Sequence, residues 1–340
     1  MKNNHYLISR TDNIGDVVLT LPLCAMIKEL DIDCKITFLG KTYTKDIVCS
    51  SKNVDYFLDW SEIQKKSLRA RIKVFKEFPY SHVIHVFPNP HIAFLTFLAM
   101  IPSRVGTGRR FYHRFFCNFL PSLSRKNSSL HEAQLNMLLV SDFFGVYPPE
   151  LDDLKKMFAL KPDESQSFPE LDMLEKKKFN LVFHPFSKGS ARNWPISHFI
   201  EAINLLDGEN FEIFLTGVDE EAQKIHHEII PHLNKKAHNI AGRMSLKELM
   251  LFLLKSDGFI SGSTGPLHIA AALGINCIGL FPPKYPMRIE RWGPLGMHAE
   301  AFVFKESPNW FCQKNCELSC ECMEKIEAKA VVKKINKWFE

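Results

Sequence analysis

Three polar loops in this sequence contain residue types that a group transfer involving an anionic substrate requires. The first loop, residues 10–16 (RTDNIGD), places Asp16 directly after a glycine, which lets the backbone approach a ligand closely. A carboxylate in this position could act as a general base and accept the proton of an attacking hydroxyl. Aspartate is also a favoured helix N-cap, so the loop alone leaves a purely structural role open.

The second loop, residues 184–195 (HPFSKGSARNWP), gathers hydroxyls and cations. Ser187, Lys188 and Arg192 could neutralise a diphosphate, because arginine offers bidentate contacts and lysine a compact charge. The alternative is an ordinary solvated surface loop.

The third loop, residues 261–268 (SGSTGPLH), combines small residues with Pro266 in the first turn of a predicted helix. Backbone N–H groups around Thr264 and Gly265 would then be exposed to an anion such as phosphate. A glycine-rich loop is a weak signal by itself, and this one gains weight from its occurrence with the second loop.

Each loop follows a short apolar segment and precedes a segment of helical composition. We predict strands at 6–9, 35–39, 82–87, 180–184, 212–216, 258–261 and 277–281, and helices at 17–30, 61–78, 195–206, 220–230, 245–255, 266–273 and 323–339. This alternation indicates α/β domains with parallel sheets. Ligands of such sheets bind beyond the carboxyl ends of the strands, which is where the three loops are expected.

A length of 340 residues favours two domains, because one hydrophobic core rarely serves so long a chain. An irregular, charged stretch at 151–178, interrupted by Pro162 and Pro169, is the best candidate for the connection. We therefore predict domains at 1–168 and 169–322, and a final helix within 323–340 that packs at the domain junction.

Composition and charge argue against several classes of protein. No apolar stretch as long as a secretory signal follows the first residues, and the longest apolar run, 91–102, is shorter than the ~20 residues that span a bilayer. Nine cysteines, an odd number, fit reduced thiols better than a disulfide framework, so we expect a cytoplasmic protein. The net charge of +5 is too small to argue for nucleic acid, and no nucleic-acid-binding motif accompanies it.

The three loops, in this order and spacing, resemble the signature of glycosyltransferase family 9, the ADP-heptose:lipopolysaccharide heptosyltransferases. Arg10 and residues 14–17 (IGDV) match an arginine and an Ile/Leu-Gly-Asp-Val step, and residues 185–195 resemble a Pro-Gly-Ser loop that runs to a Lys-x-Trp-Pro step. Residues 244–246 (MSL) and 263–268 (STGPLH) match two later steps. The resemblance covers most of the chain.

Three residues depart from the family pattern. Phe186 replaces a glycine and Arg192 replaces a lysine, so the positive charge is kept while its geometry changes. Ser263 stands where the family has an aspartate in the donor site. This last departure bears on the identity of the donor sugar more than on the reaction class.

The resemblance implies a GT-B fold of two facing Rossmann-like α/β domains with parallel sheets, the first binding the acceptor and the second the nucleotide sugar. It also implies an inverting glycosyltransferase, in which Asp16 deprotonates an acceptor hydroxyl that attacks the anomeric carbon opposite the nucleoside diphosphate. The expected donor is ADP-heptose, and the expected acceptor is a lipopolysaccharide inner core of the lipid A–Kdo type. No cofactor or metal is expected, because cations and backbone N–H groups can meet the charge of the leaving group.

The same resemblance assigns candidate residues to each part of the reaction. The donor diphosphate would be bound by Ser187, Lys188, Arg192, Thr264, Gly265 and His268, although His268 could also only cap a helix. The nucleoside and sugar would contact Thr216, Gly217, Asp219, Met244, Ser263 and Pro266. The acceptor would contact Arg10, Asn13, Gly15, Arg104, Arg109, Arg110 and Arg114.

The segment 104–126 interleaves basic and aromatic side chains. An acidic glycolipid would suit such a surface, as would the anionic cytoplasmic face of the inner membrane. An ordinary solvated face is the alternative, since charge runs are usually just solvated.

Four late cysteines follow a C-x3-C-x3-C-x-C spacing, which lacks the paired C-x2-C knuckles of common zinc sites. They are Cys312, Cys316, Cys320 and Cys322. Reduced structural thiols are the favoured interpretation and metal binding is the alternative.

Two other functions remain open at this point. An enzyme of the same fold and mechanism could use a different nucleoside-diphosphate sugar, because fold does not determine specificity. A noncatalytic protein could instead bind a sugar nucleotide and use Asp16 only as a helix cap.

Overall fold

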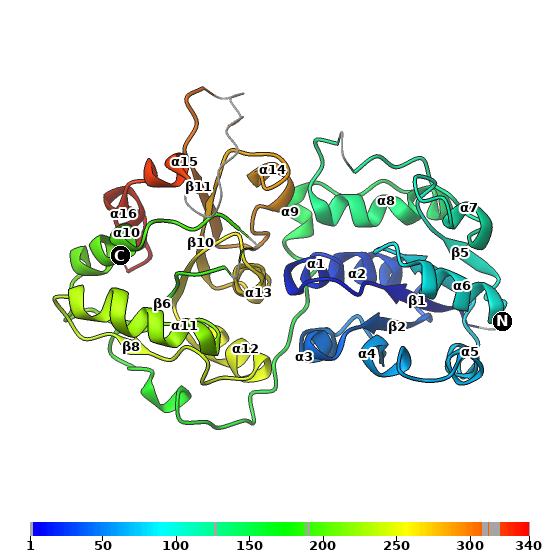
Figure 1. Ribbon diagram of the computed structural model, residues 1–340, viewed down its shortest axis with the longest axis horizontal. Coiled ribbons are helices and arrows are strands. Elements are labelled where there is room, and N and C mark those ends of the chain that lie inside the picture. The colour runs from blue at the N-terminus through cyan, green and yellow to red at the C-terminus, as the bar shows by residue number, and fades with distance from the viewer. Residues whose placement is uncertain are drawn as a thin grey trace. The chain divides into compact units, whose positions relative to one another are not determined.

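The computed structural model describes residues 3–125, 128–187, 189, 191–307, 312 and 320–339, and the chain divides into two compact units, Met1–Lys161 and Pro162–Glu340 (Figure 1). The division precedes the predicted boundary at residues 168 and 169. Asp163 and Glu164 show why, because they form ion pairs with Lys247 and Lys255 of the second unit.

The first unit is built on a sheet of five parallel strands in the order β3-β2-β1-β4-β5. These strands are β1 (His5–Ser9), β2 (Lys35–Gly40), β3 (Tyr56–Asp59), β4 (His82–His85) and β5 (Ser103–Val105). Every residue of the central strand β1 is buried, as expected for a parallel strand covered on both faces. The direction of winding changes between β1 and β4, which makes the loop after β1 a topological switch point.

Short helices connect these strands. They are α1 (Ile14–Val18), α2 (Leu21–Leu30), η1 (Thr42–Thr44), α3 (Lys45–Cys49), α4 (Trp60–Ile63), α5 (Leu68–Lys76), α6 (Pro90–Leu98), α7 (His113–Phe116), α8 (Glu132–Phe144) and α9 (Leu151–Leu154). The helix predicted at 17–30 is divided into α1 and α2, because Pro22 fits only the first turn of a helix. The stretch predicted as one helix at 61–78 likewise forms α4 and α5.

The second unit contains a sheet of six parallel strands in the order β11-β10-β9-β6-β7-β8. These strands are β6 (Phe179–His184), β7 (Phe211–Leu215), β8 (His238–Asn239), β9 (Gly258–Gly262), β10 (Asn276–Phe281) and β11 (Ala299–Val303). If these strands are renumbered 1 to 6 along the chain, their order read from β8 to β11 is 3-2-1-4-5-6, the doubly wound order. The switch point of this sheet lies between β6 and β9. The second and third predicted loops follow these two strands.

The helices of the second unit connect its strands in the same way. They are η2 (Leu171–Met173), α10 (Ile196–Leu205), α11 (Asp219–Lys224), η3 (Ile225–Ile229), η4 (Ile230–His232), α12 (Leu246–Lys255), α13 (Gly265–Leu273), α14 (Ile289–Trp292), α15 (Glu321–Glu324) and α16 (Ala328–Phe339). The helix predicted at 220–230 changes from α-helix to π-helix at Ile225. No helix in the described part of the chain is long and apolar enough to cross a membrane.

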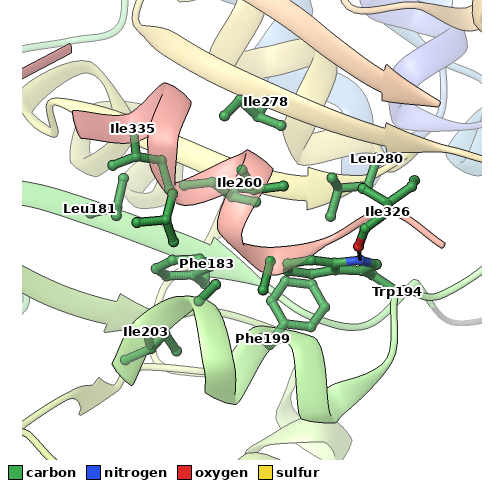
Figure 2. Close-up of a cluster of buried hydrophobic side chains, with 14 of the residues drawn as sticks. Leu181, Phe183, Trp194, Phe199, Ile203, Ile260, Ile278, Leu280, Ile326 and Ile335 are labelled. Carbon is green, nitrogen blue, oxygen red and sulfur yellow. Dashed lines mark hydrogen bonds between the residues drawn. The ribbon is translucent and has the colours of Figure 1, made fainter. Parts of the chain in front are cut away.

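Figure 2 shows the buried core of the second unit, where Phe183 of β6 and Ile260 of β9 pack with residues of α10 and α16. Trp194 is buried, and its Nε1 donates a hydrogen bond to the carbonyl oxygen of Ile326 at 2.8 Å. Ile335 of α16 is buried in the same cluster. The final helix was expected at the domain junction, and these contacts place it on the core of the second unit.

Candidate functional site

Asp16 lies in the first turn of α1, directly beyond the carboxyl end of β1. The N-cap of α1 is Asn13, whose side chain makes no capping hydrogen bond. The alternative interpretation of Asp16 as an N-cap is therefore wrong. The Asp16 side chain is 15% exposed, so it is not fully sealed from solvent.

A single buried arginine contacts three carboxylates at this position. Arg10 is 3% exposed, and its Nε donates to Oδ1 of Asp12 at 2.7 Å. Its Nη2 donates to Oδ1 of Asp16, and its Nη1 lies 3.4 Å from Oε1 of Glu132. Arg10 therefore orients the Asp16 carboxylate, a role different from its predicted contact with the acceptor.

Helix α8 completes this network with two buried residues one turn apart, Glu132 and Asn136. Asn136 Oδ1 accepts hydrogen bonds from Arg10 at 3.2 Å and from Arg125 at 3.0 Å. Arg125 also donates to Glu132.

The network also holds the backbone of α1. Asn136 Nδ2 donates to the carbonyl oxygen of Leu19 at 2.9 Å. Thr20 Oγ1 lies 3.2 Å from the same amide and donates to the carbonyl oxygen of Asp16 at 2.8 Å. These contacts fix α1, and with it Asp16, against α8.

Burial raises the pKa of Asp16, while the Arg10 guanidinium opposes this change and the Glu132 carboxylate adds to it. Burial also raises the pKa of Asp12 to about 6, against the attraction of Arg10. Three carboxylates thus share two guanidinium groups in a site of low exposure. A carboxylate of raised pKa in such a site is a stronger proton acceptor than one in water, which is what a general base requires.

The site prediction from sequence did not include Asp12, Glu132 or Asn136, and it placed Arg125 only within the basic and aromatic segment 104–126. One signal could have pointed to two of them. Glu132 and Asn136 are four residues apart and so share one face of a helix that buries that face. A charged residue on a buried face requires a partner of opposite charge.

In the second unit, the two predicted phosphate loops lie side by side at the switch point. A Cβ added to Gly262 would be 3.5 Å from the carbonyl oxygen of Arg192. The buried Ser187 Oγ lies 3.0 Å from the carbonyl oxygen of Ala191 and 2.8 Å from Oδ1 of Asn193, which stabilises the second loop. Lys188 lies outside the described residues.

Helix α13 starts from the third loop, with Gly265 as its first residue and Pro266 as its second. Its N-cap Thr264 makes no side-chain capping hydrogen bond, and its Oγ1 lies 2.8 Å from Oγ of Ser261. The first N–H groups of α13 are therefore not capped by the Thr264 side chain, and such groups are the donors that bind an anion at a helix N-terminus. His268 is buried within the same helix.

Of the residues predicted to contact the nucleoside and sugar, Thr216, Gly217, Asp219 and Met244 follow β7 and β8, whereas Ser263 and Pro266 follow β9. Thr216 directly follows β7, and its hydroxyl lies 3.0 Å from Nδ1 of His184, the last residue of β6. Gly242 has a φ of 72°, and a Cβ there would be 2.6 Å from Cα of Asp219. Only glycine fits this close approach, which brings Asp219 next to the loop that carries Met244.

The predicted acceptor arginines lie in three different environments. Arg10 is buried in the carboxylate network. The Arg104 guanidinium is held by backbone, because its Nε donates to the carbonyl oxygen of Phe116 at 2.7 Å and its Nη1 to that of Ile101. Arg109, Arg110 and Arg114 are exposed around α7.

Cys312, Cys320 and Cys322 are buried in the core of the second unit, and Cys316 lies outside the described residues. Burial and the two neighbouring thiols raise the pKa of Cys322 to about 12. Without a metal ion, a thiol of such a pKa is protonated at neutral pH. Within the described ranges no group of three or more His, Cys, Asp or Glu side chains is arranged to hold a metal ion.

Comparisons with known proteins agree on one family. The sequence model of glycosyltransferase family 9 (heptosyltransferase) matches residues 69–321. A predicted glycosyltransferase of Haemophilus influenzae is 26% identical over 321 residues, which cover 92% of each chain. The lipopolysaccharide core heptosyltransferase OpsX of the same organism is 23% identical and covers 83% of this chain and 80% of its own.

Among solved structures, the ADP-heptose lipopolysaccharide heptosyltransferase II of Escherichia coli superimposes with a TM-score of 0.77. The match covers 98% of each chain at 17% identity, a level that shows the fold. Two parallel-sheet α/β units of this kind define the GT-B fold of glycosyltransferases, so the fold predicted from the sequence is confirmed. The chain belongs to glycosyltransferase family 9, the heptosyltransferase family, and its enzyme class is that of the glycosyltransferases.

The raised pKa of Asp12 predicts an unusual dependence of stability on pH. Its pKa is about 6 in the folded chain and 3.8 for a free aspartate side chain, so the folded state binds more protons between these limits. The contribution of Asp12 to the free energy of unfolding is therefore greatest below pH ~4 and is lost as the pH rises through ~6, by at most about 3 kcal/mol.

Urea unfolding of wild type and Asp12→Asn across this pH range measures the effect. The difference in stability between the two proteins should shift in favour of Asp12→Asn as the pH rises. Asp46→Asn, in the first turn of α3, is the control. A difference between wild type and Asp12→Asn that does not change with pH would contradict the prediction.

Proposed function

We propose that this protein is an inverting heptosyltransferase that moves a heptose from ADP-heptose to a hydroxyl of a lipopolysaccharide inner core of the lipid A–Kdo type. The observation that carries the proposal is the Asp16 carboxylate, which is oriented by the Arg10 guanidinium, raised in pKa and partly exposed. Membership of the heptosyltransferase family and the likeness to OpsX support the choice of donor and acceptor.

In the proposed reaction, Asp16 accepts the proton of the acceptor hydroxyl as its oxygen attacks the anomeric carbon. The bond to the nucleoside diphosphate breaks on the opposite face of the sugar, which inverts the configuration without a covalent intermediate on the enzyme. Arg10 keeps the carboxylate in place, and burial keeps it basic. General base catalysis of this kind contributes about 10²–10⁴-fold to a rate.

The charge that develops on the leaving diphosphate requires stabilisation, which we assign to the second unit. The first N–H groups of α13, the Thr264 hydroxyl and the side chains of Ser187, Lys188 and Arg192 would supply it. His268 would add a further contact. Because these groups can meet the charge, the proposal needs no metal ion.

The roles of the two units follow from these assignments. The unit that contains Asp16 binds the acceptor, and the unit with its switch point between β6 and β9 binds the nucleotide sugar. Since the acceptor is a membrane glycolipid, we place the reaction at the cytoplasmic face of the inner membrane.

Ser263 supports a second candidate, an enzyme of the same mechanism with another donor sugar. It stands where an aspartate is usual in the family, and it lies between the switch-point strand β9 and helix α13. A hydroxyl in place of a carboxylate changes the hydrogen bonds offered to the donor sugar.

Calorimetric binding of a panel of nucleoside-diphosphate sugars separates these candidates. We expect ADP-heptose to bind most tightly, and Lys188→Ala and Arg192→Ala to weaken it at least about tenfold by removing charge-assisted contacts to the diphosphate. Lys176→Ala serves as a control for loss of an exposed cation on the same unit. Preference for another nucleotide sugar would reassign the donor, and no binding of any of them would contradict the proposal.

If Asp16 is the base, substitution of Glu132, which contacts no substrate in the proposal, should change the pH dependence of the rate. Glu132 raises the pKa of Asp16, so Glu132→Gln should lower it and move the acidic limb of the kcat/KM profile to lower pH. Glu62→Gln, an exposed carboxylate paired with Lys65, is the matched control. If the limb stayed in place or moved to higher pH, Asp16 would not be the group that titrates in the rate.

A further inference from the structure

Helix α6 is apolar on both of its faces. Its inner face buries Ile92 and Leu95 in the core of the first unit. Its outer face presents Phe94 and Phe97, whose side chains are 36% and 41% exposed. A helix with one face in water normally carries polar residues there, so the outer face of α6 has the composition of a surface that a partner covers.

Helix α7 lies beside α6 (Figure 1), and it and the turn before it add further exposed aromatic side chains. Phe116 connects the two helices, with its ring centroid 5.4 Å from that of Phe94 and 5.6 Å from that of Phe97. Phe111 and Phe115 lie 4.9 Å apart and are 74% and 62% exposed. We call the exposed side chains of Phe94, Phe97, Met100, Phe111 and Phe115 the α6–α7 surface.

The charge around the α6–α7 surface has one sign. Residues 78–131 contain no aspartate or glutamate. Within this segment Arg109, Arg110 and Arg114 are exposed next to the aromatic side chains. Exposed apolar side chains with arginines beside them match a boundary where acyl chains meet anionic headgroups.

We propose that the α6–α7 surface binds an anionic lipid bilayer, with Phe111 and Phe115 inserted between the lipids and Arg109 and Arg110 against the headgroups. This inference does not depend on the proposed transfer reaction. A nucleic acid would leave the exposed phenylalanines of α6 without an apolar partner, since such interfaces are polar. A symmetric second copy would bring like arginines together, which is unfavourable.

Co-sedimentation of the full chain with vesicles tests the proposal directly. We expect binding to vesicles of equal parts phosphatidylglycerol and phosphatidylcholine, weaker binding as salt is added, and much weaker binding to phosphatidylcholine alone. Arg109→Gln with Arg110→Gln should weaken the partition coefficient at least about tenfold, because each basic residue near the surface contributes roughly fivefold.

Two further variants complete the design. Phe111→Ser with Phe115→Ser should weaken binding to a similar extent while the melting temperature is kept, since both side chains are exposed. Lys176→Gln with Lys177→Gln removes an exposed pair of charges from the second unit and should leave binding within about twofold of wild type.

Several outcomes would overturn the inference. They are wild-type affinity in both double variants of the α6–α7 surface, equal binding to neutral vesicles, binding of RNA in place of vesicles, and self-association of the free protein through this surface. The transfer reaction is tested separately on a water-soluble, deacylated acceptor, on which Phe111→Ser with Phe115→Ser should turn over as wild type does. If wild type binds anionic vesicles but transfers no sugar to the deacylated acceptor, the proposed function is contradicted and the inference about the α6–α7 surface still holds.

Discussion

The contact on which the proposed chemistry depends is the buried Arg10 guanidinium shared by Asp12, Asp16 and Glu132. Removing a charge from water is costly unless it gains partners of opposite charge and hydrogen bonds. Here the partners come from the loop after β1, from α1 and from α8, so folding of the first unit is itself what assembles the site. Because burial disfavours the charged form and the Glu132 carboxylate adds to this effect, Asp16 keeps a raised pKa despite its ion pair.

The two units place different chemical groups at the same position of a parallel sheet, the switch point. In each, a parallel sheet changes its direction of winding beside a central strand, β1 in the first unit and β6 in the second. The loop after β1 leads to a carboxylate, and the loops after β6 and β9 lead to hydroxyls, a cation and the start of α13. A proton acceptor and an anion site are the two elements that transfer from a nucleotide sugar requires.

Much of this architecture could be predicted from the sequence, because long apolar strands and loop composition are local signals. Each of the seven predicted strands is present. The sequence missed β3, β5, β8 and β11, which are all incompletely buried and so lack a strong apolar pattern. The break between α1 and α2 at Pro22 had a visible cause that the helix prediction did not weigh.

The site was predicted less completely, for a physical reason. The position of Asp16 follows from the strand and loop before it, but Arg10, which holds Asp16, also bonds to Glu132 across 122 residues of sequence. Such a contact depends on how α8 packs beside α1, which a local pattern does not encode. The exposure of Arg109 and Arg110, separate from the buried Arg10, depends on the same tertiary packing.

Single-turnover transfer by Asp16→Asn tests the central claim most directly, with Asp46→Asn as a control from an equivalent position in α3. Asparagine keeps an oxygen that can accept from Arg10 but cannot take the proton of the acceptor. The account predicts a loss of at least about 10²-fold in the rate of transfer, with donor affinity and melting temperature unchanged. A rate within a few-fold of wild type in a folded, donor-binding variant would contradict the assignment of Asp16 as the base.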